Sequence, residues 1–183
     1  MSKKGTITTA NFIEYDKALN TGLKLMESKK DINFGFYIIV AINTGLRIGD
    51  ILKLTKEDFE NDSKQFREGK TNKAKDLTLN ISILNAFEKL NLKGSGVFLS
   101  QKGSTYSPQQ INRKLKVVFK AKNKNISSHS LRKSFGRRVY ENNGESEKAL
   151  ITLSQIYNHS SIGITRTYLD ITKEEIENVY LNL

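Results

Sequence analysis

The 183-residue sequence lacks several residues on which common kinds of site depend. It has no cysteine, which excludes disulfides, zinc ribbons and thiol chemistry. Two histidines are too few for a histidine-rich metal site, although a carboxylate site stays open. The longest apolar run, residues 36–42, is far shorter than the roughly 20 residues of a membrane span. The start is too polar for a signal peptide, so we expect a soluble, cytoplasmic protein.

Hydropathy patterning predicts one mainly helical domain. Hydrophobic residues make up 37% of the chain, enough for a packed core. Apolar residues recur at three- and four-residue spacing, which is typical of amphipathic helices. The predicted helices cover residues 9–29, 31–43, 82–90, 108–121, 128–141, 145–157, 161–169 and 172–181, with a short helix after Gly45. Residues 65–67 and 77–81 look like two strands joined by a polar turn. The expected fold is α+β, mainly α with a small antiparallel β-hairpin, in a single domain over residues 1–183.

Positive charge is concentrated in one part of the chain. The formal net charge is +11, yet residues 89–140 carry 13 basic side chains and no acidic one. The same stretch has Ile111, Leu115 and Val118 at helical spacing, so we expect it to be folded. A folded basic face without carboxylates is typical of a protein that binds a polyanion. We interpret it as a nucleic-acid surface, in preference to a contact with another anionic surface.

One segment with residues able to do chemistry is 127–135. Ser127 can cap a helix just before His129, and Arg132 follows on the same face one turn later. The free N–H groups at a helix start favour a phosphate, and an imidazole with a guanidinium could hold it and move a proton. Alone, this pattern more often marks a packed histidine and a surface arginine.

Two further segments carry candidate residues. In residues 44–50, Arg47 begins a helix after the glycine-ended core helix, and Asp50 one turn on could orient its guanidinium. An ordinary ion pair of little energetic value is the alternative. The other segment, residues 157–169, contains His159 and, nine positions later, Tyr168. A single tyrosine is usually a packing residue, so Tyr168 is a functional candidate only because of the motif residues around it.

Taken in order, T-G-L-R-I-G-D, H-S-L-R-K-S-F and N-H-S-S-I-G-I-T-R-T-Y resemble the signature of the tyrosine recombinases, the lambda-integrase family of phage integrases. The gaps also fit, with 82 positions from Arg47 to His129 and 27 from Arg132 to His159. Three ordered motifs are far more specific than any one of them. The resemblance implies the catalytic-domain fold of that family and a site-specific recombinase that integrates, inverts or excises DNA.

The resemblance also implies a role for each motif residue. Tyr168 would attack a DNA phosphodiester, giving a 3′-phosphotyrosyl link and a free 5′-hydroxyl. Arg47 and Arg132 would bind the non-bridging oxygens and stabilise the transition state. His129 would assist proton removal from Tyr168, and His159 would donate a hydrogen bond to the phosphate.

Two details of the resemblance concern loops. The family keeps a lysine in the hairpin turn as the acid for the leaving 5′-oxygen; Lys70 is our first choice for it and Lys73 the alternative. Asp50 stands where the family often has an acidic residue, which implies a supporting role. Before His159 the family typically shows Leu-Gly, whereas this chain has Tyr157-Asn158. Asparagine tolerates the same turn geometry, so we expect the loop to keep its shape.

The resemblance sets expectations for cofactors and partners. A phosphotyrosine link conserves the energy of the broken bond, so neither ATP nor a metal ion is implied. The implied partners are double-stranded DNA and further copies in a tetramer, with the C-terminal helix docked either on a neighbour or on its own domain. Many relatives place a core-binding domain before the catalytic one, and we expect none within residues 1–183 because about ten residues precede the first predicted helix. The chain is then either a natural minimal recombinase or a fragment of a longer one. A nucleoid-associated location follows.

Two alternatives remain at this point. The same chemistry fits a type IB topoisomerase-like nicking and closing of one duplex. A catalytically silent DNA-binding module for architecture or regulation is the alternative from another class. The intact set of Arg47, His129, Arg132, His159 and Tyr168 argues against it, because a non-catalytic binder has no need of a nucleophile.

Overall fold

The structure, a computed structural model, describes residues 10–28, 30–60, 63–67, 69, 74–120 and 125–183. Along the chain its elements are α1 (Tyr15–Met26), α2 (Ile32–Thr44), α3 (Ile48–Ile51), a 3-10 turn (Lys56–Asp58), β1 (Ser63–Arg67), β2 (Ala74–Thr78), α4 (Ile81–Phe87), α5 (Pro108–Val118), α6 (Ser128–Asn142), α7 (Glu147–Tyr157), α8 (Ile162–Tyr168) and α9 (Ile171–Leu181). The mainly helical fold with one hairpin is therefore confirmed. In these ranges no helix is both long and apolar enough to cross a membrane.

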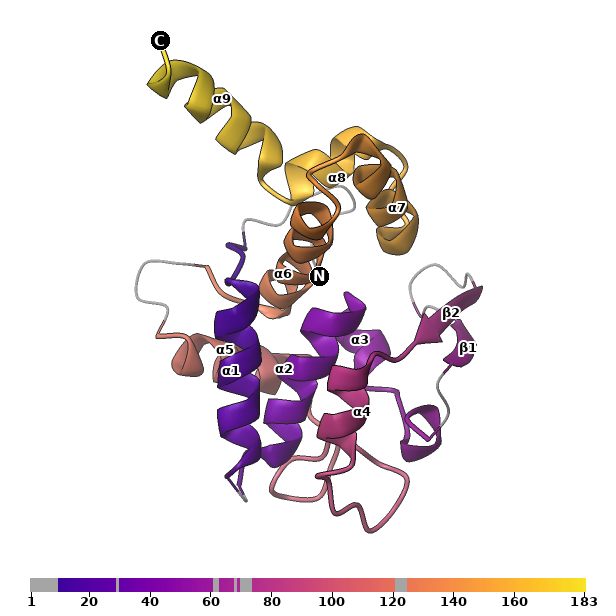
Figure 1. Ribbon diagram of the computed structural model, residues 1–183. Coiled ribbons are helices and arrows are strands. Elements are labelled where there is room, and N and C mark those ends of the chain that lie inside the picture. Colours follow the sequence, from indigo (N-terminus) through magenta and orange to yellow (C-terminus); the bar gives the residue numbers. More distant parts are fainter. Residues whose placement is uncertain (1–9, 29, 61–62, 68, 70–73, 121–124) are drawn as a thin grey trace.

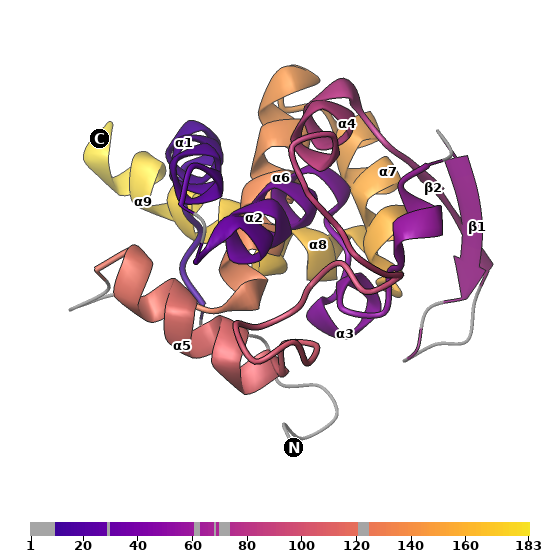
Figure 2. The ribbon, with the colours of Figure 1, turned by 90° about the horizontal axis from the view of Figure 1, so that it is seen from below.

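Helix α2 lies at the centre of the larger part of the molecule. Every residue from Phe34 to Ala41 is buried, as expected for a helix that is apolar on all sides. Helices α1, α4 and α6 pack against it, and Figure 2 shows them around it. Gly45 ends α2 with φ of 60°, the left-handed conformation that glycine adopts without strain.

The apolar residues form two clusters that meet along α6. The larger one surrounds α2 and includes Leu131 near the start of α6. The smaller one includes Tyr140 near the end of α6 and joins it to α7 and α8. In Figure 1, α6 runs from the group of α1, α2 and α5 toward α8, and α9 extends away from the rest. Helix α6 therefore fixes the last three helices relative to the rest.

The hairpin lies at one edge of the molecule (Figure 1). Strands β1 and β2 are antiparallel, with Ser63 opposite Thr78 and Arg67 opposite Ala74. The second strand was predicted at residues 77–81 but ends at Thr78, because the Asn80 side chain accepts a hydrogen bond from the Ile83 N–H and caps α4. The cap removes the residues after Thr78 from the sheet.

Helix α1 begins at Tyr15, although the periodicity predicts a start near Thr9. The chain just before it is held by distant partners. The N–H of Asn11 donates to the carbonyl of Asn125 (3.0 Å), and the N–H of Ile13 donates to Ser134 Oγ (3.1 Å). Because these donors are bound to other parts of the fold, the helix cannot extend through them.

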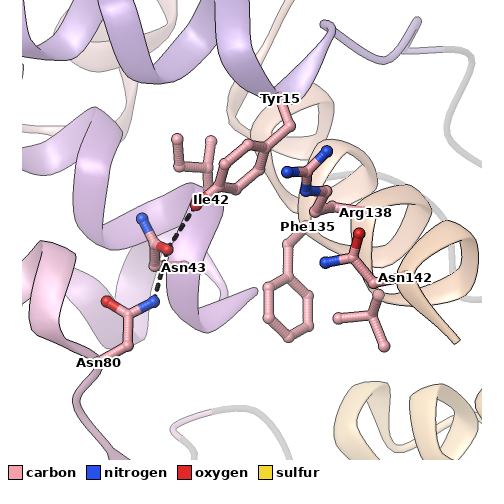
Figure 3. Close-up of a pocket in the computed structure, with 8 residues that line it drawn as sticks. Tyr15, Ile42, Asn43, Asn80, Phe135, Arg138 and Asn142 are labelled. Atoms are coloured by element: carbon pink, nitrogen blue, oxygen red, sulfur yellow. Dashed lines mark hydrogen bonds between the residues drawn. The ribbon is translucent and has the colours of Figure 1, made fainter.

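The C-terminal end of α2 is held by the side chain of Asn43. Its carbonyl oxygen accepts hydrogen bonds from Tyr15 Oη and Asn80 Nδ2, both at 2.7 Å, and so joins α1, α2 and the start of α4 (Figure 3). A half-open pocket of about 280 Å³ lies beside these residues, with Arg138 and Phe135 of α6 on its other side. This network fixes the turn that leads from α2 into residues 45–47.

Helices α1 and α2 approach closely through two glycines, which gives a test of the packing. A Cβ on Gly35 would lie 2.6 Å from the Gly22 carbonyl oxygen and 2.9 Å from the Met26 nitrogen, both backbone atoms. We expect Gly35→Ala to lower the free energy of unfolding by about 1–3 kcal/mol, measured by urea denaturation. Gly94→Ala is the control, since nothing lies within 4 Å of its new Cβ. Equal stability of the two variants would contradict the packing.

Candidate active site

Tyr168 is the last residue of α8, and its side chain is 9% exposed. Three rings surround it in edge-to-face contact. The ring centroids of Tyr157 and His159 both lie 5.4 Å from that of Tyr168, and the centroid of His129 lies at 6.5 Å. His129 comes from the first turn of α6, where Ser127 caps the helix as predicted. Segments nearly 40 residues apart therefore meet around one phenol.

Two arginines from distant segments converge on a single carbonyl oxygen. Arg47 Nη2 donates to the Tyr157 carbonyl at 3.1 Å, and Arg132 Nη2 donates to the same oxygen at 3.2 Å. Arg132 Nη1 also donates to the carbonyl of Gly45, just before Arg47. The shared acceptor ends α7, and the C-terminal end of a helix carries partial negative charge. Two guanidinium groups are thereby held side by side beside Tyr168.

Tyr157 also holds Arg132 through its side chain. The guanidinium carbon of Arg132 lies 4.2 Å from the centroid of the Tyr157 ring, a cation–π contact. The Tyr157 hydroxyl donates to the Arg132 carbonyl at 2.6 Å, and there is room for it only because Gly136 has no Cβ. In the sequence, Tyr157 stood out only because it replaces the leucine that is usual in the family. This replacement was the one feature of the sequence that could have indicated its contact with Arg132.

The loop after α7 places His159. Asn158 adopts the left-handed conformation, with φ of 57° and ψ of 46°, so asparagine takes the place of the usual glycine as expected. The His159 N–H donates to the Ser154 carbonyl at 2.9 Å. Its Nδ1 lies 3.0 Å from Oγ1 of Thr165, a fully buried residue that the motifs did not single out. That contact leaves Nε2 as the second ring nitrogen available for a substrate.

Burial and the two arginines set the protonation states in the site. Desolvation, followed by Arg132 and Arg47, lowers the pKa of His159 from 6.5 to about 4, so the ring is neutral at neutral pH. Desolvation raises the pKa of Tyr168 to about 12, while Arg132 and Arg47 act in the opposite direction. The buried Tyr168 hydroxyl makes no hydrogen bond of normal geometry within the described residues. It is therefore a protonated phenol in a positive environment.

The low pKa of His159 predicts a pH effect on stability. Between about pH 4 and 6.5 the unfolded chain binds a proton at this residue that the folded chain does not. This part of the stability is therefore lost as the pH falls through that window. We expect an NMR titration to show one imidazole titrating near pH 4, assigned by its absence in His159→Gln. We also expect acidification from about pH 7 to 5 to destabilise wild type more than His159→Gln. Titration of the His159 ring near pH 6.5 would contradict the lowered pKa of this residue.

Asp50 and the turn lysines lie on the hairpin side of the site. Asp50 is 6% exposed, and its Oδ1 accepts the N–H of Gly69 at 2.9 Å. It therefore supports the hairpin turn, whereas the Tyr157 carbonyl orients Arg47. Lys70 and Lys73, the two predicted choices for the turn lysine, lie outside the described residues. Across the described chain, no three or more His, Asp and Glu side chains are grouped so as to hold a metal ion.

The basic stretch is only partly a surface. Arg132 and Lys133 are buried, at 4% and 1% exposure, and Lys133 is paired with a carboxylate. Lys114 is half-buried and lies 2.5 Å from Asp31. The charge count along the sequence therefore overstates the number of cations on the face of the molecule.

Comparison with known proteins assigns this arrangement to a family. The sequence profile of the Phage integrase family matches residues 14–175. The chain belongs to the Phage integrase family. It is 29% identical over 162 residues to the probable integrase/recombinase YoeC of Bacillus subtilis (strain 168), covering 85% of this chain and 86% of that protein. Family membership confirms the resemblance drawn from the three motifs. It also confirms the prediction that the protein is a site-specific recombinase that acts on DNA.

Solved structures agree on the integrase fold. The crystal structure of XerA recombinase superposes with a TM-score of 0.69 at 17% identity, over 99% of this chain. The XerH recombinase bound to a palindromic difH substrate, in a post-cleavage complex, gives 0.63 at 21% identity over 98% of this chain. The match spans 66% of the XerA chain and 55% of the XerH chain. These likenesses confirm the catalytic-domain fold.

Proposed function

We propose that residues 1–183 act as one catalytic domain that cleaves and rejoins double-stranded DNA of the nucleoid through a covalent link to Tyr168. The observation that carries this proposal is the meeting of a buried phenol with two guanidinium groups from α6 and the start of α3. A phosphate seated on the guanidinium groups would lie next to the phenol. This is the geometry that an attack on phosphorus requires.

The proposed step exchanges one phosphate ester for another. Tyr168 Oη attacks the phosphorus, the bond from phosphorus to the 5′-oxygen breaks, and the 5′-oxygen leaves with a proton. A pKa of about 12 keeps Tyr168 protonated at neutral pH, so its proton must move as the bond forms. His129 is the proposed acceptor, because its ring and that of Tyr168 are neighbours in a T-shaped arrangement, with centroids 6.5 Å apart. Lys70 is the proposed donor to the 5′-oxygen, with Lys73 the alternative.

The remaining groups stabilise charge on the phosphate. Arg47 and Arg132 are proposed to bind the two non-bridging oxygens, where negative charge grows in the pentacoordinate transition state. Neutral His159 is proposed to donate Nε2–H to the same phosphate, with the Thr165 hydroxyl donating to Nδ1. Because hydrogen bonds to the Tyr157 carbonyl and to Thr165 hold these donors in place, little reorganisation is needed when the charge develops.

Covalent trapping on a nicked suicide duplex tests the nucleophile. We expect wild type to form an adduct that survives SDS and maps to Tyr168, and Tyr168→Phe to form none while DNA affinity changes less than about twofold. Tyr106→Phe is the matched control, since Tyr106 is 6% exposed but belongs to the larger cluster around α2. We expect this control to form the adduct at the wild-type rate.

The outcomes separate the proposal from its alternatives. An adduct that persists in Tyr168→Phe would place the nucleophile elsewhere. Tight, salt-sensitive DNA binding without any wild-type adduct would favour the silent DNA-binding module. Supercoil relaxation without strand exchange between two duplexes would favour the topoisomerase-like activity.

We further propose that α9 docks on a neighbouring copy when the protein assembles as a tetramer on DNA. Figure 1 shows α9 projecting away from the other helices. Its apolar residues are mostly exposed: Ile176 (54%), Val179 (62%), Tyr180 (75%) and Leu181 (80%). An apolar helix face of this kind is stabilised by burial against a partner.

A charge on this face should prevent assembly without affecting the site. We expect Val179→Asp to abolish complexes with more than one copy per DNA in analytical ultracentrifugation, because the carboxylate would be buried in the contact. Ile81→Asp is the control, since Ile81 is equally exposed, at 67%, on α4. Assembly that survives Val179→Asp would show that α9 packs only on its own domain.

A further inference from the structure

Lys133 is an ammonium ion in the interior of the protein. Its side chain is 1% exposed, and Nζ lies 2.7 Å from Oδ2 of Asp170, whose side chain is 38% exposed. Nζ also lies 5.6 Å from the centroid of the Tyr168 ring. A buried ammonium is costly unless a carboxylate stays beside it, so this pair ties the chain just after α8 to the middle of α6.

A second side chain of α6 holds the same stretch of chain. Arg137 Nη1 donates to the carbonyl of Leu169 at 3.0 Å, one residue after Tyr168. Leu169 is fully buried, and its side chain fits against Gly136. The three residues from Tyr168 to Asp170 are thus bound to one face of α6, which Figure 1 shows running toward α8.

The backbone at Asp170 is in a conformation that needs support. Its φ is 61° and its ψ is 15°, in the left-handed region that few non-glycine residues adopt. This residue lies between α8 and α9, so its conformation sets the direction in which the chain leaves Tyr168. The ion pair with Lys133 fixes the side chain of the residue that makes this turn.

We propose that Lys133 is a positioning residue whose ion pair with Asp170 holds Tyr168 at the correct distance from the phosphate. Arg132, which is proposed to bind the phosphate, and Lys133, which holds the nucleophile segment, are neighbours on α6. One rigid helix therefore sets the separation between phosphate and phenol, and neither Lys133 nor Asp170 needs to touch the DNA.

This inference rests on the proposed function, and it predicts a rate effect opposite to that of electrostatics alone. Asp170 raises the pKa of Tyr168 by its negative charge. Removing that charge would ease proton loss and, by itself, would speed cleavage. Loss of positioning instead slows cleavage, because a misplacement of about 1 Å can cost about 100-fold in rate.

Asp170→Asn is the decisive variant, because asparagine adopts the left-handed conformation as readily as aspartate and lacks only the charge. We expect single-turnover adduct formation at saturating protein to slow by about 10- to 100-fold, with the dissociation constant for DNA within about twofold of wild type. Lys133→Met, which keeps the length of the stem, should slow it similarly. The double variant should be no slower than the slower single variant, since both remove the same interaction.

Hydrogen exchange provides a second readout that does not depend on catalysis. The amides of Leu169 and Asp170 donate to the carbonyls of Thr165 and Thr167, at 3.0 and 3.2 Å. In the protein without DNA we expect these two amides to exchange at least about tenfold faster in Asp170→Asn than in wild type. Asp31→Asn is the matched control, because it removes the carboxylate partner of Lys114 far from the site. It should change neither the exchange nor the cleavage rate.

The two measurements keep the proposals separate. Unchanged exchange at Leu169 and Asp170, or faster cleavage by Asp170→Asn, overturns the positioning role. Slower cleavage together with equally weakened DNA binding also overturns it, because the pair would then support the fold in general. A wild-type protein that forms no adduct counts against the proposed function, while the exchange result still decides whether the pair holds this segment.

Discussion

The site depends on one backbone oxygen, the carbonyl of Tyr157 at the end of α7. Two guanidinium groups repel each other, and they stay together here because both donate to this acceptor and the helix end adds partial negative charge. The same residue stacks its ring on Arg132 and donates its hydroxyl to the backbone of α6. If α7 were to shift, Arg47, Arg132 and the loop that carries His159 would all lose their positions.

Burial makes the site fixed and creates its main chemical difficulty. The phenol of Tyr168 is surrounded by aromatic rings, which raises its pKa and disfavours the charged form that attacks best. The arginines partly offset this effect, whereas at His159 burial and then the arginines act in the same direction, lower its pKa and keep the ring neutral. A neutral imidazole can donate a hydrogen bond without adding another positive charge, so a single electrostatic arrangement serves both residues.

Local signals predicted those elements whose interactions are local. The apolar run of α2, the glycine that ends it and the serine cap of α6 involve residues within a few positions of one another, and all three were correctly predicted. The predicted start of α1 and the predicted position of β2 were wrong. Just before α1, the N–H groups of Asn11 and Ile13 are held by residues more than a hundred positions away. In β2 the cap at Asn80 determined the strand end.

The order and spacing of three motifs alone predicted the family and singled out five candidate site residues, and the tolerance of asparagine for left-handed turns predicted the conformation of Asn158. What the tertiary structure decided is how these residues are held. Tyr157, Thr165 and Lys133 act through partners between 6 and 110 positions away, and Asp50 binds a backbone N–H of the hairpin. A sequence pattern records which side chains are present. The pairing of a buried ammonium with one carboxylate becomes visible only when packing removes both from water.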